Sequence, residues 1–465
     1  MNKSIRRISM ILVVILFGTL LLGGCSSEKT PAEDTTDENV EGDSSNVTDD
    51  EEAKDSGEQV ELDIFQFKVE IAKQLEEAIE AYEEENPNVK VNLETVGGGD
   101  DYGAALRAKF ASGSEPAIFN VGGPQDVEDW MHKLEDLSDE PWVDLALPGV
   151  VDGVVSDGGI YGMPYNMEGY GFIYNKRIFE AADIDASNIN DFDSLEKAVK
   201  TLDQKIKSGD LKDEFPQLEA VFELPAKENW VTGLHTSNVF LGQEFESSID
   251  SYNADTVEFK YGDQFKQIID LQADYSSNSE KKEQLTSVDY ATQVDQGLAI
   301  ERVAIIQQGN WIYPEVEDID PEVAENLGIL PIPVQGGKED SIPVGVPMYW
   351  AINKDQDDAA KDAAKDFLNW LYTSDEGKDF VVNKFHFIPP LNGYEDVRPE
   401  DALGAAVLEY SEADKVTPWV FMGYPTGWGE DVLGINIQVY LAGGASWDEV
   451  LNTCMEEWKN TRQSE

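Results

Sequence analysis

The sequence predicts an α/β fold divided into two lobes. After the first sixty residues, segments with the apolar and polar alternation of strands are followed by segments whose apolar residues recur every three or four positions, as in helices. This repeated order of strand and helix is typical of α/β folds with a largely parallel sheet. About 400 residues take part, more than a single hydrophobic core usually serves, so we expect two lobes.

The alternation begins with a strand at Val60 to Phe67. The apolar positions of the following helix run from Val69 to Tyr82, and Pro87 lies just beyond its last turn, before a second strand at Val89 to Leu93. The same reasoning predicts helices at Tyr102 to Ser112 and Pro124 to His132, a strand at Ala117 to Val121, and a short hairpin around Asp157-Gly158-Gly159.

The same architecture continues through the second half of the chain. From Pro399 to Lys459 the pattern is mostly helical, apart from an aromatic and glycine-rich loop between Pro418 and Gly429. Before it, strands are expected at Phe172 to Tyr174, Val303 to Gln307, Gly328 to Ile332 and Tyr349 to Ile352, and helices at Leu195 to Lys207, Phe265 to Asp274, Ala359 to Tyr372 and Asp375 to Val382.

The first 24 residues have the order of a secretory signal peptide. Basic residues at positions 3, 6 and 7 precede an apolar stretch from Ile8 to Leu22, shorter than the roughly 20 residues that a membrane-spanning helix needs. The sequence Leu22-Gly23-Gly24-Cys25 resembles a bacterial lipobox, in which the cysteine is lipidated and becomes the new N-terminus. We therefore expect residues 1–24 to be removed and Cys25 to carry a lipid (palmitate) anchor at the outer face of the cell membrane.

The next segment, 25–60, is expected to be a disordered acidic linker. It has no aromatic residue, and 13 acidic residues outnumber two lysines, so it has too little apolar surface to offset the entropy of ordering. The whole chain is also acidic, with a net charge of −59 from 34 basic and 93 acidic residues. Because phosphates require a basic surface, this charge excludes nucleic acid as a partner and disfavours anionic ligands.

Several motifs of the folded part occur in a recognisable order. Tyr161-Gly162-Met163-Pro164 is followed by a strand that ends in Tyr174-Asn175-Lys176, and later by Ala304 to Trp311 and by Gly328 to Gly377. In order and spacing the chain resembles family 1 extracellular solute-binding proteins, the group that contains maltose-binding protein. The resemblance covers roughly residues 61–460.

This resemblance implies a two-lobed periplasmic-binding-protein fold (type II-like) that closes on a ligand and performs no chemistry. It implies delivery of a carbohydrate to the permease subunits of an ABC importer, and we expect a monomer without a cofactor. The ten tryptophans favour an oligosaccharide over a monosaccharide. Three hinge crossings are expected near Asn166 to Gly171, Val344 to Tyr349 and Phe387 to Leu391. Lobe 1 would then comprise 61–167 plus 346–388, and lobe 2 would comprise 168–345 plus 389–465.

A neutral sugar presents apolar C–H faces ringed by hydroxyls, so its site needs aromatic surfaces for stacking together with amides and carboxylates. By resemblance, Trp311 matches a tryptophan that stacks on sugar, and Glu168 matches a cleft carboxylate. Trp230 and Trp350 are further aromatic candidates, as is one of Trp419 and Trp428, between which the sequence does not choose.

Polar candidates follow from the topology and from the first crossing. Ligands of open α/β sheets sit at the carboxyl ends of the strands, which selects Gln66, Lys68, Asn120 and Asp126. Tyr165 and Asn166 are neighbours of Glu168 on the crossing and complete the predicted ligand-binding set.

Two alternatives remain open for the function. An exported carbohydrate-active hydrolase also has paired carboxylates in an aromatic cleft. A peptide-binding or polyamine-binding receptor of similar fold would use the acidic surface to hold a cationic ligand. The three histidines, at positions 132, 235 and 386, show no metal-ligand spacing, so we predict no metal site.

Overall fold

The computed structural model describes residues 59–98, 100–394 and 399–464. All of the described residues belong to the larger of the chain's two units, residues 56–465. The predicted signal peptide, Cys25 and all but the end of the acidic linker lie outside the described residues. In the part of the chain that is described, no helix is long and apolar enough to cross a membrane.

The first sheet of the larger unit begins as a parallel sheet, as the sequence predicts. The strand order is β2 (Val89–Thr95), β1 (Val60–Gln66), β3 (Ile118–Val121), β12 (Tyr349–Ile352) and β6 (Met163–Pro164). β1 pairs in parallel with β2 on one side and with β3 on the other, whereas β12 runs antiparallel to both β3 and β6.

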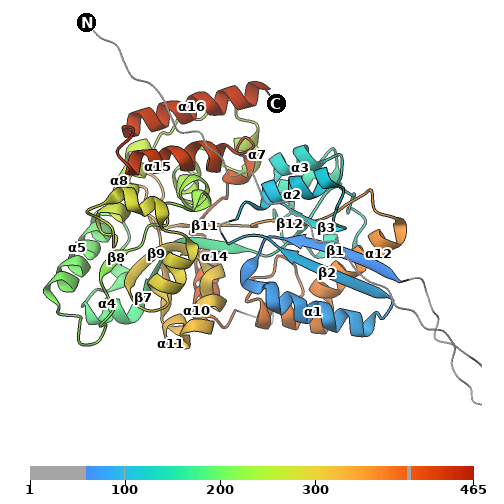
Figure 1. Cartoon of the computed structure of the whole chain (residues 1–465), viewed down its shortest axis with the longest axis horizontal. Helices are drawn as coiled ribbons and strands as arrows, with labels where there is room; N and C mark the ends of the chain where they lie inside the picture. Colours follow the sequence, from blue (N-terminus) through green and yellow to red (C-terminus); the bar gives the residue numbers. More distant parts are fainter. Residues whose placement is uncertain (1–58, 99, 395–398, 465) are drawn as a thin grey trace, which may run out of the picture. The chain divides into compact units, whose positions relative to one another are not determined.

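Helices cover both faces of this sheet (Figure 1). Leu62 and Ile64 of β1 point into a core formed with α1 (Ala72–Glu85) and α12 (Asp358–Thr373), while Phe65 points into the opposite core with α2 (Tyr102–Ser112). This follows from the alternation of side chains along a strand. Two shorter helices, α3 (Pro124–Trp130) and α13 (Asp375–Asp379), and the predicted hairpin of β4 (Val155–Ser156) and β5 (Gly159–Ile160), complete this part.

The second sheet is mixed, unlike the largely parallel sheet that the sequence suggests. Its central strand, β7 (Glu168–Asn175), runs antiparallel to β9 (Val303–Gly309), β10 (Leu327–Leu330) and β11 (Ile342–Gly345). The two edges are parallel pairs, formed by β8 (Ala220–Phe222) on β9 and by β13 (Val416–Thr417) on β11.

The second sheet has a larger set of helices and one extensive core. At the N-terminus of α5 a reciprocal capping box between Asp191 and Ser194 fixes the start of the helix. The helices are α4 (Lys176–Ala181), α5 (Phe192–Ser208), α6 (Ser237–Leu241), α7 (Ser248–Tyr252), α8 (Gly262–Asp274), α9 (Tyr290–Gln293), α10 (Tyr313–Ile319), α11 (Pro321–Glu325), α14 (Ala402–Glu412), α15 (Ile435–Leu441) and α16 (Trp447–Ser464).

The chain passes between the two sheets at 165–167 and at 346–348, which join β6 to β7 and β11 to β12. Near the third predicted crossing, Ile388 bridges to Met167, but Leu391 and Tyr394 pack again in a core of the first sheet. The return to the second core is complete by Leu403, after an interval that includes residues outside the described part. The exact limits of the two lobes stay a prediction.

We call the second sheet with its helices the second part of the unit. Two of its π-helical segments pack directly against each other. They are η5 (Trp230–Thr236) and η11 (Trp428–Gly434). A Cβ atom at Gly233 would lie only 1.9 Å from the carbonyl oxygen of Gly429, so the two backbones approach as closely as glycine permits. Both segments contribute residues to the cavity described next.

Candidate functional site

A cavity of about 470 Å³ is lined by residues from both parts of the unit. From the first sheet come the residue stretch 67–70, directly after β1, and the glycines Gly122 and Gly123, directly after β3. These are carboxyl ends of parallel strands, where ligands of open α/β sheets bind. From the second part come Trp230 and Trp311, among other aromatic residues.

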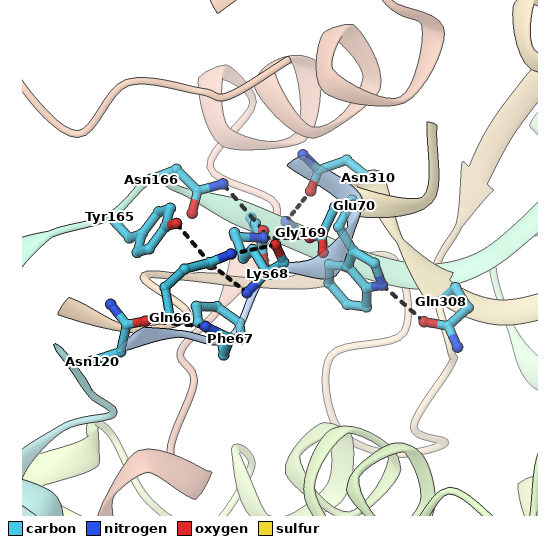
Figure 2. Close-up of polar contacts among 12 residues, drawn as sticks. Gln66, Phe67, Lys68, Glu70, Asn120, Tyr165, Asn166, Gly169, Gln308 and Asn310 are labelled. Atoms are coloured by element: carbon cyan, nitrogen blue, oxygen red, sulfur yellow. Dashed lines mark hydrogen bonds and ion pairs between the residues drawn. The ribbon is translucent and has the colours of Figure 1, made fainter. Parts of the chain in front are cut away.

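An ion-paired group at the cavity joins the two sheets. Lys68, just beyond β1, contacts the carboxylate of Glu168, the first residue of β7, and its Nζ lies 2.7 Å from Oε1 of Glu70 (Figure 2). Both Lys68 and Glu168 are buried. Burial lowers the pKa of Lys68, but the charges of Glu168 and Glu70 outweigh it, so this pKa is raised above its ordinary value. We call these three residues the charged group.

Gln66 fixes the backbone that presents Lys68. The amide nitrogen of Lys68 donates to Oε1 of Gln66 at 2.6 Å, and Nε2 of Gln66 donates to the carbonyl oxygen of Lys68 at 2.8 Å. The hydroxyl of Tyr165 also donates to Gln66, at 3.1 Å (Figure 2). Gln66 and Tyr165 are therefore placed behind Lys68 and do not line the cavity.

The second part contributes an aromatic wall to the cavity. His235 lies at its centre, with ring centroids 5.2 Å from Trp230, Trp311 and Phe421 and 5.6 Å from Trp419. Burial lowers the pKa of His235 to about 3, so its imidazole is neutral. We call these five residues the aromatic wall.

The tryptophans of the aromatic wall differ in their polar partners. Nε1 of Trp311 donates to Oε1 of Gln308 at 2.9 Å, and Nε1 of Trp230 donates to Oε2 of Glu228 at 3.1 Å. Nε1 of Trp419 is buried without a hydrogen-bond partner. Trp311 and Trp230 therefore use their single donors within the protein, which leaves their ring faces for contact with a ligand.

Carboxylates from both parts meet at another stretch of the cavity lining. Asp126 of α3 accepts a hydrogen bond from the amide nitrogen of Gly122 at 2.6 Å. Burial, together with the negative charges of Asp101 and Asp431, raises the pKa of Glu430 to about 7. We call Asp101, Asp126, Glu430 and Asp431 the acidic end, all four of which line the cavity.

The structure brings half of the predicted ligand-binding residues to the cavity. Those that line it are Lys68, Asp126, Glu168, Trp230, Trp311 and Trp419. Of the two tryptophans that the sequence left undecided, Trp419 therefore lines the cavity, whereas Trp428 does not. Their contact with a ligand stays a prediction, which the geometry permits.

The other six predicted residues lie behind the cavity lining or in the cores; they are Gln66, Asn120, Tyr165, Asn166, Trp350 and Trp428. Tyr165 and Trp350 stack on each other with ring centroids 4.1 Å apart. Trp428 donates to the carbonyl oxygen of Cys454 at 2.8 Å. Their positions support packing roles instead of direct ligand contact.

Asn120 and Asn166 support neighbours that do line the cavity. Oδ1 of Asn120 accepts from the amide nitrogen of Phe67 at 3.2 Å, and Nδ2 of Asn166 donates to Glu168 at 3.1 Å (Figure 2). Asn166 thus orients a carboxylate of the charged group, and Asn120 holds the residue before Lys68.

Among the residues that line the cavity and that sequence reasoning did not select are Glu70, His235, Tyr290, Phe421 and Glu430. Glu70 could have been found, because it lies two residues after Lys68 at the end of a predicted strand. His235 carries no such signal, because it reaches the cavity through the π-helical segment η5, whose spacing no regular helical or strand pattern predicts.

The family model described as bacterial extracellular solute-binding protein matches residues 68–378. No curated protein matches the chain.

Solved structures match over most of the chain. A chitin oligosaccharide binding protein is 21% identical with a TM-score of 0.71, covering 88% of this chain and 100% of that chain. RafE in complex with raffinose is 18% identical with a TM-score of 0.68, covering 87% and 100%. A sugar transporter from Bacillus licheniformis in complex with stachyose is 19% identical with a TM-score of 0.65, covering 86% and 100%. These similarities establish the α/β fold predicted from the sequence.

Proposed function

Because this chain belongs to the family of bacterial extracellular solute-binding proteins, we propose that it captures an oligosaccharide outside the cytoplasm and delivers it to the permease of an ABC importer. The observation that carries the proposal is the meeting of the aromatic wall and the charged group on one cavity. Ring faces suit the C–H surfaces of a sugar, and carboxylates accept hydrogen bonds from its hydroxyls.

The solved structures with a similar fold support a carbohydrate as ligand. Their descriptions name chitin oligosaccharide, raffinose and stachyose. The cavity has a volume of about 470 Å³, and several aromatic residues line it. We therefore favour an oligosaccharide over a monosaccharide.

Capture would use residues from both lobes. Lys68, Glu70 and Asp126 belong to the first sheet and its loops, and Trp230, Trp311 and Trp419 belong to the second part. A ligand that contacts both sets stabilises the closed arrangement relative to an open one. The permease would then recognise the closed, loaded form.

The location of the protein is the second part of the proposal. Cys25 is lipidated after removal of residues 1–24, and the linker keeps the folded unit near the outer face of the cell membrane as a monomer. Mass spectrometry of the chain purified from membranes tests this directly. A mature N-terminus at Cys25 with an added acyl mass is expected, and an unmodified cysteine contradicts the anchor.

A thermal-shift screen of the full chain in detergent tests the ligand class. The panel contains neutral oligosaccharides, monosaccharides, spermidine and short peptides. A ligand at 100 times its dissociation constant stabilises the folded state by about 2.7 kcal/mol, which raises the melting temperature by a few degrees.

Each outcome of this screen separates the proposal from its alternatives. Stabilisation by an oligosaccharide that is recovered intact supports a sugar receptor. Recovery of a cleaved sugar supports a hydrolase. Stabilisation by spermidine or peptide alone contradicts a carbohydrate as the ligand.

A further inference from the structure

Trp311 is connected to a distant backbone carbonyl by a line of buried amides. Its Nε1 donates to Oε1 of Gln308 at 2.9 Å. Nε2 of Gln308 donates to Oε1 of Gln293 at 2.8 Å, and Nε2 of Gln293 donates to the carbonyl oxygen of Glu223 at 2.8 Å. Both glutamines are buried, and neither lines the cavity.

The chemistry at the two ends fixes the direction of this line. An indole nitrogen can only donate, so Gln308 must present its oxygen to Trp311. A backbone carbonyl can only accept, so Gln293 must present its nitrogen to Glu223. Only one orientation of each side-chain amide satisfies both ends, and a flip of either amide would leave two buried groups unpaired.

We propose that Gln293 and Gln308 are positioning residues that fix the plane of the Trp311 ring at the cavity. Gln308 lies on β9, three residues before Trp311, and acts directly on the indole. Gln293 ends α9 and acts through Gln308. The effect on ligand affinity rests on the function proposed above, whereas the effect on the ring does not.

This arrangement also determines which part of a ligand Trp311 can contact. Because the only polar atom of Trp311 is bonded to Gln308, the ring offers no hydrogen bond to a sugar hydroxyl. Trp311 is 9% exposed, so a small part of its surface is available. Trp311 therefore contacts a sugar ring through its C–H face, and recognition of hydroxyls is left to other groups of the cavity.

A second pair of buried glutamines, one on a helix and one on β9, supplies a matched control. Nε2 of Gln272, on α8, donates to Oε1 of Gln307 at 3.2 Å, and Nε2 of Gln307 donates to Oγ1 of Thr236 at 2.7 Å. Gln272 and Gln293 are both fully buried and both donate from a helix. Only Gln293 lies on the line to Trp311.

The test compares Gln293→Leu with Gln272→Leu in the full chain labelled with 5-fluorotryptophan. The fluorine resonance of Trp311 is assigned by its loss in Trp311→Phe. We expect Gln293→Leu to shift or broaden this resonance and to weaken saccharide binding about tenfold, the size of one lost buried hydrogen bond. Gln272→Leu should leave the resonance in place and the affinity within about twofold.

The Trp311→Phe background separates positioning from general stability. Phenylalanine keeps a stacking face but has no N–H, so the line is already cut. In this background Gln293→Leu should weaken binding by no more than about twofold further. An equal loss in both backgrounds overturns the proposal.

The remaining outcomes also decide it. An unchanged Trp311 resonance in Gln293→Leu overturns the positioning role whatever the affinity. If the wild-type chain binds no saccharide, the proposed function fails, but the resonance still tests the ring. If Gln293→Leu does not fold, Gln308→Leu is measured instead, because it removes the acceptor for Nε1 of Trp311, and an unchanged resonance in that variant would also overturn the proposal.

Discussion

The aromatic wall and the charged group line the same cavity but are held in opposite ways. Every residue of the aromatic wall belongs to the second part of the unit, and two of its tryptophans are bonded to that same part. The charged group instead joins the two sheets, because Lys68 follows β1 and Glu168 begins β7.

This difference assigns different tasks to the two regions. Separation of the sheets would leave the aromatic wall intact but would break the contact between Lys68 and Glu168. The wall is therefore a preformed surface, whereas the charged group exists only when the sheets are together. Lys68 and Glu168 are buried when the sheets are together, and water would solvate both charges if the sheets separated. The free energy of closure therefore depends on this charge pair.

The largest effect that tests this comparison is loss of Glu168. Glu168→Ala leaves Lys68 buried with Glu70 as its remaining partner, and breaking a buried pair costs about 3–5 kcal/mol of unfolding free energy. Urea denaturation measures the loss. Glu196→Ala, which breaks the exposed pair with Lys200, should cost no more than about 0.5 kcal/mol. Similar losses for both variants would refute a special role for the charged group.

Glu430 of the acidic end makes the stability of the folded chain depend on pH. Because the pKa of Glu430 is about 7 in the folded chain, above its ordinary value, the folded state binds the proton more tightly than the unfolded state. Its stabilising contribution, up to about 3 kcal/mol, is present below the ordinary carboxylate pKa and is lost as the pH rises through 7.

The variant Glu430→Gln should therefore lose the fall in stability with rising pH that Glu430 contributes between pH 4 and 8. Urea denaturation at several pH values measures the difference between wild type and variant. The lowered pKa of His235, about 3, makes stability rise with pH in both chains, so that the difference between them reports Glu430. Parallel profiles for the two chains would show that Glu430 does not hold its proton in the folded state.

Loss of a ring from the aromatic wall should weaken ligand binding and leave the closure of the two sheets unchanged. Trp311→Ala removes a stacking face and should weaken oligosaccharide binding about 30-fold, near 2 kcal/mol, in a calorimetric titration. Trp447→Phe is the control, because Trp447 is buried outside the cavity. An affinity within about threefold of wild type would remove Trp311 from the binding surface.

The smallest predicted effect is a difference in stability between variants of two tryptophans of the same loop region. Trp428→Phe loses the bond to the carbonyl oxygen of Cys454 and should cost about 1–2 kcal/mol of stability. Trp419→Phe removes a buried donor that has no partner, so its stability should fall by less. Thermal unfolding compares the two variants, and the reverse order would contradict this assignment.

Sequence patterns predicted the regular elements better than the arrangement of the second sheet. The helix at Tyr102 to Ser112 and the strand at Tyr349 to Ile352 begin and end where expected, because capping residues and turns flank them. The antiparallel pairing of β7 with three neighbours was not predicted. Strand direction depends on contacts between distant segments, which local periodicity does not contain.

The site was predicted as far as strand ends and family motifs could locate it. Lys68 lies at a strand end and reaches the cavity, but Gln66, two residues earlier, turns back to hold the Lys68 backbone. The sequence does not distinguish these two roles. His235 and Glu430 lie on π-helical segments, whose side-chain directions follow neither regular period.

The contact between Gly233 and Gly429 restricts how this cavity can be redesigned. Any side chain at Gly233 would collide with the backbone of Gly429 and push apart two segments that carry cavity residues. The separation of these segments is thus set by main-chain contact and cannot be tuned by choosing a larger or smaller residue there. A protein engineer who wants a new ligand specificity should keep Gly233 and vary the side chains around it. Any library that randomises Gly233 would have to shift these two segments.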